Sequence, residues 1–235
     1  WDPVENVSLM PWLCLTALLH TIIVLEKRSL LKSWTVILSI ATFTLSMSGT
    51  FLVRSGILNS VHTFANDPKR GVFILLFLFG LILLSLILFF IYQDKENNSQ
   101  KKFFLISKET SILVNNWFMM YFLSVVLIGT IYPIFLEVLI NEKISIGPPF
   151  FNKLLIPFLA VFLIFMSIGP KLNWIKDNFE KIKYLRIILF FICIILSFYL
   201  IKKTSSEILF TSVIGGGALY LLFISIEDLF KKKYN

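Results

Sequence analysis

The chain has 235 residues, of which 57% are hydrophobic and only 15% are charged, and its formal net charge is +8. A mean hydropathy of +0.84, with the charges gathered in short clusters between long apolar runs, excludes an ordinary water-soluble domain and indicates an integral membrane protein. In such a protein, the positive charge is first tested against the distribution of Lys and Arg among the loops, before nucleic acid is considered as a partner.

Seven apolar runs follow one another along the chain. A helix of about 18 or more residues can cross a bilayer, and in lipid only helices and closed barrels satisfy the backbone polar groups. The sequence therefore predicts an all-α fold, a polytopic helical membrane protein with about seven transmembrane helices in one membrane domain over residues 8–235. The predicted spans are 8–25, 33–53, 72–92, 113–136, 152–170, 187–201 and 207–226.

Two of these helices have clear start signals. Asp2 and Pro3, followed by Glu5, are typical of an N-cap, a proline in the first turn and an acid that completes a capping box. Asp67 and Pro68 repeat the signal before the third span. We expect both helices to begin at the same surface of the membrane.

Prolines within the spans predict kinks and helix ends, and small residues predict places where helices pack closely. Pro11 and Pro133 are expected to kink the first and fourth spans, and Gly169-Pro170 to end the fifth. Residues 215–217 are three glycines and are expected to break the last span. Their function there is either close packing or local flexibility. A stripe of small residues in the second span is expected to allow close approach of a neighbouring helix: Thr35, Ser39, Thr42, Ser46 and Gly49.

Basic residues are distributed unequally between alternate loops. Loops 26–32, 93–112, 171–186 and 227–235 hold 15 of the 22 Lys and Arg residues, and the other loops with the N-terminal stretch hold 7. By the positive-inside rule, the first set faces the inside. Residues 1–7 and the loop 54–71 then face outward, with position 62 outside and position 98 inside.

The two histidines are predicted to serve two different sites. His20 lies 12 residues after Ser8, about 18 Å into the membrane, where an ionisable side chain is a functional candidate. A hydrogen-bonded packing role is the alternative. His62 lies in the outer loop, where a solvated side chain without a role is the alternative. Because their depths differ by about 18 Å, the two imidazoles are not expected to bind one metal.

Three basic residues of the outer loop run against the inside bias. Arg54, Lys69 and Arg70 lie on the side where basic residues are scarce, which points to an anionic partner, although the two later residues could simply reach lipid headgroups. Cys14 and Cys193 lie in apolar spans and are interpreted as packing residues.

Three stretches resemble one known family. WDPVENVSLMPWL with ALLH, GTFLVRSGILNSVHTFANDPKRG, and ISIGPPFFN are similar to the CcmF family of cytochrome c haem lyases, in the system I maturation pathway. The similarity runs along residues 1 to 152 and includes the spacing between the two histidines. It implies a membrane enzyme that joins haem vinyl groups to the thiols of a CxxCH motif in apocytochrome c.

The resemblance also implies roles for individual residues. Trp1, Asp2 and Glu5, within the segment 1–7, correspond to the end of an external tryptophan-rich platform for haem that arrives on the haem chaperone CcmE. The position of His62 matches an external axial ligand of that haem. Arg54, which lies in the matched stretch before His62, is a further candidate cofactor-binding residue. The position of His20 matches an axial ligand of a permanent b-type haem, which passes electrons to the first haem.

The implied partners are CcmE, apocytochrome c, a CcmH-like thiol protein, other fragments of the same lyase and the lipid membrane, with no nucleic acid. Most of the platform, one external histidine, a second membrane histidine and a large external domain of the family have no counterpart here. Each haem would therefore have one protein ligand from this chain. We expect a split or truncated piece of a lyase, inactive without partner fragments, in a mitochondrial or bacterial inner membrane. Residues 1–7 and 54–71 would face the intermembrane space or periplasm.

Three alternatives remain open at this stage. A haem-delivery protein of the CcmC or CcsA type shares a tryptophan-rich segment with the family. A secondary transporter could use the glycine-containing last span and His20 to line a substrate route, although the sequence has no inverted repeat or intramembrane carboxylate. A degenerate piece with only a scaffolding role is the third.

Overall fold

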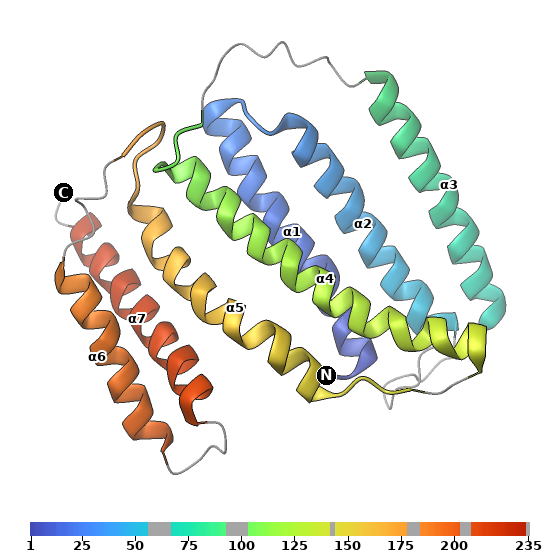
Figure 1. Ribbon diagram of the computed structural model, residues 1–235. Coiled ribbons are helices and arrows are strands. Elements are labelled where there is room, and N and C mark those ends of the chain that lie inside the picture. The colour runs from blue at the N-terminus through green and yellow to red at the C-terminus, as the bar shows by residue number, and fades with distance from the viewer. Residues whose placement is uncertain (56–66, 93–102, 142–143, 178–183, 203–207, 234–235) are drawn as a thin grey trace. The chain divides into compact units, whose positions relative to one another are not determined.

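The computed structural model describes residues 1–55, 67–92, 103–141, 144–177, 184–202 and 208–233 (Figure 1). In this part of the chain, every regular element is a helix. The described residues divide into two compact units: Trp1–Lys101 with Met119–Asn152, and Lys102–Phe118 with Lys153–Asn235. The predicted all-α fold is confirmed.

Three helices of the first unit follow one another as neighbours: α1 (Pro3–Arg28), α2 (Lys32–Ser55) and α3 (Pro68–Tyr92) (Figure 1). Ser29 and Leu31 adopt φ angles of 53° and 65°, and the Ser29 N–H donates to the Leu25 carbonyl at 2.8 Å. This tight connection places α1 and α2 side by side. The C-terminal part of α4 (Lys108–Ile140) and the start of α5 (Pro148–Ile168) complete the unit.

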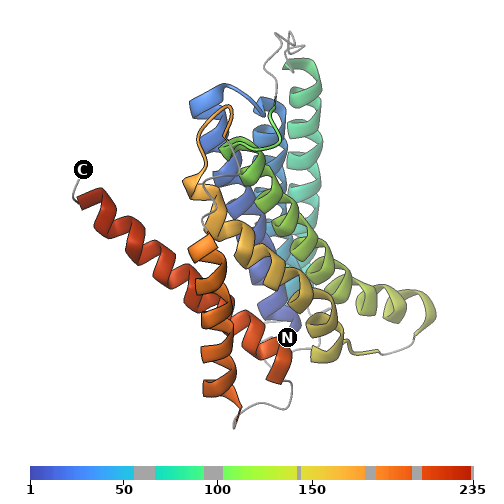
Figure 2. The ribbon, with the colours of Figure 1, turned by 60° about the vertical axis from the view of Figure 1, so that its left-hand side comes forward.

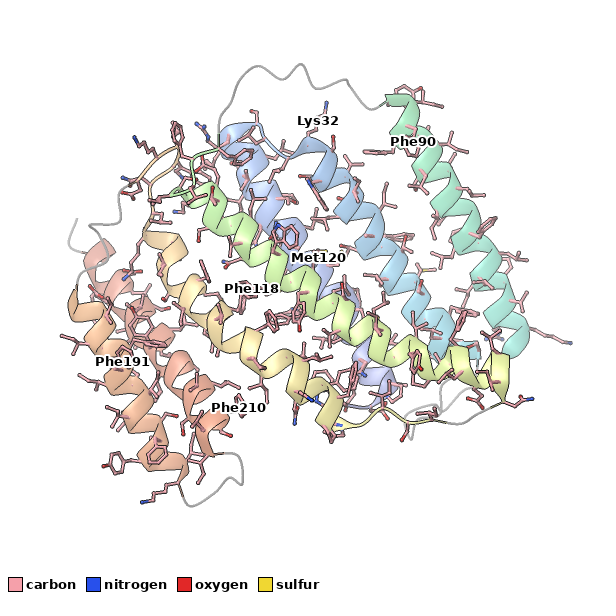
Figure 3. All side chains as sticks on the ribbon, in the orientation of Figure 1. Lys32, Phe90, Phe118, Met120, Phe191 and Phe210 are labelled. Atoms are coloured by element: carbon pink, nitrogen blue, oxygen red, sulfur yellow. The ribbon has the colours of Figure 1, made fainter. Side chains whose placement is uncertain are left out.

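The second unit contains the start of α4, most of α5 (Pro148–Ile168), the short 3-10 helix η1 (Gly169–Lys171), α6 (Tyr184–Ile201) and α7 (Ile208–Lys233). Helices α6 and α7 pack against each other and are inclined to one another (Figure 2). Phe118 of α4 points to α5, where its ring centroid lies 5.5 Å from that of Phe162 (Figure 3).

The predicted N-caps at the two helix starts are confirmed. The Asp2 carboxylate accepts the Val4 N–H at 2.9 Å, with Pro3 in the first turn. The Asp67 carboxylate accepts the Arg70 N–H at 3.2 Å. Helix α5 ends at Ile168, directly before Gly169-Pro170, as predicted. Pro11 and Pro133 both lie inside continuous helices.

The predicted break at the three glycines is wrong, because α7 runs through them without interruption. A Cβ atom at Gly216 would lie 2.6 Å from the Cα of Ile194, and one at Gly217 would lie 2.9 Å from Leu163. The glycines therefore bring the backbone of α7 close to its neighbours. Their role is close packing, the other function that the sequence suggested.

Six of the helices are long and apolar enough to cross a membrane, and Ile187–Ile201 of α6 is a shorter apolar helix. This agrees with a polytopic protein of about seven transmembrane helices. On α3, large apolar side chains such as Phe90 are exposed along the helix (Figure 3). In a membrane, these side chains face lipid tails, where apolar exposure carries no penalty.

Candidate functional site

Trp1 lies on a stack of aromatic rings that the sequence pattern did not predict. Its indole stacks on the Phe151 ring, with centroids 4.3 Å apart and planes inclined by 12°. Phe151 is fully buried, whereas Trp1 remains 41% exposed. The phenyl ring covers one face of the indole, and part of Trp1 remains exposed. The stack therefore supports a flat, partly exposed aromatic residue.

The residues after Trp1 hold the start of α1 in place. Asp2 caps the helix, and Glu5 is exposed in its first turn. Asn6 is 4% exposed and donates its side-chain N–H to the Thr130 hydroxyl of α4 at 3.2 Å. Gly49 of α2 lies against Val7, where an added Cβ would approach the valine methyl to 2.8 Å. Close approach of a neighbouring helix to the stripe of small residues is therefore confirmed at Gly49.

The two ends of the outer loop meet at the same end of the first unit. The Asp67 N–H donates to the Arg54 carbonyl at 3.0 Å, and the Asp67 carboxylate pairs with Arg70 at 3.0 Å. Arg54 is exposed at the end of α2. His62, a predicted ligand, lies outside the described residues. The described residues on either side of that segment lie close together, because Asp67 bonds to Arg54 and Gly71 lies against Ser55.

A cavity of about 350 Å³ lies between the start of α1 and the end of α2. Its walls are apolar at Pro11 and Val53 and polar at Ser8 and Thr50, with Arg54 among the lining residues. The cavity brings Arg54 close to the segment after Trp1. The structure thus gathers Trp1, Asp2, Glu5 and Arg54 at one end of the first unit.

His20 lies on α1, 18 residues after Asp2, a separation of about 27 Å at 1.5 Å per residue. Its side chain is half-buried, and Ala17 and Val24, three residues before and four after, are both buried. The imidazole therefore lies at the edge of the packed face of α1. In the described part of the chain, no group of three or more His, Cys, Asp or Glu side chains is placed to hold a metal ion.

Both cysteines are free and buried, as expected of packing residues. Cys14 lies on α1, and its thiol donates to the Leu38 carbonyl of α2 at 3.7 Å. Cys193 belongs to a cluster in the second unit with Tyr220 and Ile224.

Sequence reasoning missed a polar cluster in the second unit. Both oxygens of the buried Glu109 carboxylate accept the Ile175 N–H at 3.0 Å. The Asp177 N–H donates to the Ile106 carbonyl at 2.8 Å. The Lys171 ammonium lies 3.5 Å from Asp228. These contacts join the loops before α4 and after α5 to the end of α7, three segments that the charge distribution assigned to one side of the membrane.

The comparisons with known proteins identify the family. A family model described as Cytochrome C assembly protein matches residues 1–58. The chain is 50% identical over 178 residues, or 76% of its length, to the cytochrome c-type biogenesis protein CcmF of Pseudomonas aeruginosa. It is 41% identical over 215 residues, or 92% of its length, to CcmF of Escherichia coli.

A solved structure, Cytochrome c Heme Lyase CcmF, is similar over 97% of this chain, with a TM-score of 0.62 and 26% identity. The chain spans 27% of the Pseudomonas protein, 33% of the Escherichia protein and 33% of the solved chain. Together, the matched sequence and the shared helical fold favour this family over the transporter and haem-delivery alternatives. The chain belongs to the CcmF family of cytochrome c-type biogenesis proteins.

Proposed function

We propose that this chain is part of a membrane haem lyase that attaches haem covalently to apocytochrome c. The single observation that supports this most directly is the stack of Trp1 on Phe151, at the end of the unit where the His62 loop begins and ends. A flat aromatic residue at the same end of the unit as the residues that flank the His62 segment suits a porphyrin substrate, because aromatic rings stack on the macrocycle and imidazole binds its iron.

In this proposal, the substrate haem arrives on the outer face from the chaperone CcmE. Trp1 would stack on the macrocycle, Asp2 caps the start of α1 next to the exposed Glu5, and His62 would hold the haem iron. The exposed Arg54 guanidinium suits the haem propionates, since planar guanidinium groups pair with carboxylates. The proposed orientation places this face toward the intermembrane space or periplasm.

The proposed reaction adds a cysteine thiol of apocytochrome c across a haem vinyl group. The sulfur forms a bond to one vinyl carbon, the hydrogen is added to the other, and no group leaves. A CcmH-like thiol protein is the proposed partner at the apocytochrome cysteines. The chain acts together with the remaining parts of the lyase, which supply the second ligand of each haem.

The second proposed haem is a resident b-type haem held by His20. The half-buried His20 imidazole would hold the iron of this haem, since it lies at the edge of the packed face of α1 and is partly accessible. Neutral imidazole is the usual nitrogen ligand of haem iron. When bound, the haem supplies one-electron redox chemistry. His20 holds the group within the membrane, apart from the site near Trp1.

The experiment is a maturation assay with His62→Ala, in cells that supply the rest of a CcmF relative and a CxxCH apocytochrome. We expect loss of haem-stained cytochrome c, with partial recovery on addition of imidazole, which can replace the lost ligand. Asn59→Ala in the same loop is the matched control and should retain maturation. Full maturation with His62→Ala would show that the proposed ligand is wrong.

A further inference from the structure

Two adjacent residues of α4, Gly129 and Thr130, hold both segments that carry the aromatic stack. Thr130 accepts the Asn6 side-chain N–H at 3.2 Å, and its own hydroxyl donates to the Val126 carbonyl at 2.7 Å. Gly129 faces the Phe151 ring. The start of α1 and the start of α5 are therefore fixed to one place on α4, although Asn6 and Phe151 are far apart in the sequence.

Gly129 is required by this contact for steric reasons. A Cβ atom added there would lie 2.6 and 2.7 Å from two carbons of the Phe151 ring and 3.1 Å from Phe150. Real contacts are not that short, so any larger residue would displace the ring. Phe151 has no exposed surface and therefore little room to move. The ring can take this plane because Gly129 has no side chain in the space that the ring occupies.

The orientation of Phe151 determines the orientation of Trp1. The planes of the Phe151 ring and the Trp1 indole are inclined by only 12°. A tilt of the Phe151 ring would therefore tilt the indole or break the stack. Trp1 is only one residue before the cap of α1 and has no helical backbone to hold it. The Phe151 ring, stacked on one face of the indole, restrains its plane.

We propose that Phe151, packed on Gly129, is a positioning residue that holds the Trp1 indole in the plane needed to stack on haem. The inference rests on the proposed function for its ligand, but the positioning itself concerns only this chain. Phe151 acts through Trp1 and is not proposed to touch haem. An aromatic pair contributes about 0.5–1.5 kcal/mol beyond its buried area, so losing the support should weaken haem binding by between about 2-fold and 10-fold.

The first test uses the protein labelled with 5-fluorotryptophan in lipid nanodiscs and observed by fluorine NMR. The five resonances are assigned by single Trp→Phe substitutions at Trp1, Trp12, Trp34, Trp117 and Trp174. Phe151→Leu and Gly129→Ala should both shift the Trp1 resonance, because the ring current of the stacked phenyl ring is lost or moved. Gly80→Ala is the matched control, since a Cβ there has nothing within 4 Å. An unmoved Trp1 resonance in both test variants would overturn the positioning.

A double variant separates positioning from folding. Gly129→Ala with Phe151→Leu should recover stability lost in Gly129→Ala, because the smaller leucine gives the new methyl group room. The Trp1 resonance should nevertheless stay shifted, since leucine cannot stack. Return of the resonance to its original position in the double variant would contradict a role for the aromatic ring.

The second test measures hemin binding by the chain assembled with the rest of a CcmF relative, in a His20→Ala background, which leaves the outer site as the one observed. Phe151→Leu should lower hemin affinity within the stated range, and Gly80→Ala should not change it. A shifted Trp1 resonance with unchanged hemin affinity would mean that Phe151 is only structural. Failure of the His20→Ala parent to bind hemin would count against the proposed function, while the NMR result would still decide whether Phe151 sets the plane of Trp1.

Discussion

The Asp67 N–H donates to the Arg54 carbonyl at 3.0 Å, so the outer loop closes on itself where α2 ends and α3 begins. Arg54 also lines the cavity formed with Val7 and Ser8, near the start of α1. The proposed haem-handling residues of two separate stretches therefore lie at one end of the first unit. This arrangement requires that residues 1–8 and the ends of the 54–71 loop share one side of the membrane.

Cysteine labelling tests this sidedness with described positions. Glu5 is exposed at the proposed outer end, and Leu105 is 88% exposed in a proposed inner loop. In intact cells, an impermeant maleimide should label Glu5→Cys and not Leu105→Cys. Permeabilised cells should allow labelling of both, and the buried Cys14 and Cys193 should add little background. Labelling of position 105 alone in intact cells would reverse the topology.

The N-cap formed by Asp67 should contribute more to stability than the ion pair between Asp67 and Arg70. Asp67→Ala removes the acceptor for the Arg70 N–H and should lower the free energy of unfolding by about 1 kcal/mol. Asp67→Asn keeps the cap and should be nearly neutral, because the Arg70 pair, with 75% and 37% of its side chains exposed, contributes little. Unfolding in mixed micelles measures both variants. Equal losses would mean that the ion pair matters more than the cap.

The hydrogen bond between Asn6 and Thr130 should stabilise the first unit. Asn6→Ala and Thr130→Val should each lower the free energy of unfolding by about 0.5–1.5 kcal/mol, as for other hydrogen bonds between membrane helices. The double variant should lose less than the sum of the two, since they remove one interaction. Thr50→Val is the control, because that hydroxyl donates within its own helix. Additive losses would argue against the bond.

Gly216 should tolerate no larger side chain. In Gly216→Ala the new Cβ would lie 2.6 Å from the Ile194 backbone, and we expect destabilisation of about 1–3 kcal/mol from overpacking. The same substitution at Gly80 should be neutral or slightly stabilising, because the position is open and alanine favours helix. Thermal unfolding in detergent compares them. A neutral Gly216→Ala would show that α6 and α7 are not in such close contact.

Local signals predicted the helix ends well, because a cap depends on residues a few positions apart. Asp2 caps α1 by accepting the Val4 N–H, and Asp67 caps α3 by accepting the Arg70 N–H. The glycines of α7 were harder to interpret. Glycine weakens an isolated helix, but it also allows a neighbouring backbone to approach, and packing against Ile194 decided between these effects.

The aromatic stack could not be derived from pattern. Trp1 and Phe151 lie at nearly opposite ends of the first unit's sequence, and no periodicity relates them. The stretch ISIGPPFFN drew attention only through its resemblance to a family. A glycine in the middle of α4 gives no sign of which ring it faces. The roles of Trp1, Asp2, Glu5, Arg54, His20 and His62, and the boundary after residue 7, remain predictions.

The most direct test of the central claim is the optical and electron paramagnetic resonance spectrum of the chain assembled with the rest of a CcmF relative. The account predicts the low-spin signal of a six-coordinate b-type haem, because a partner histidine completes the coordination that His20 begins. His20→Ala should abolish this signal, and His62→Ala should leave it intact, since the two residues serve separate sites. Survival of the low-spin signal in His20→Ala would contradict the account.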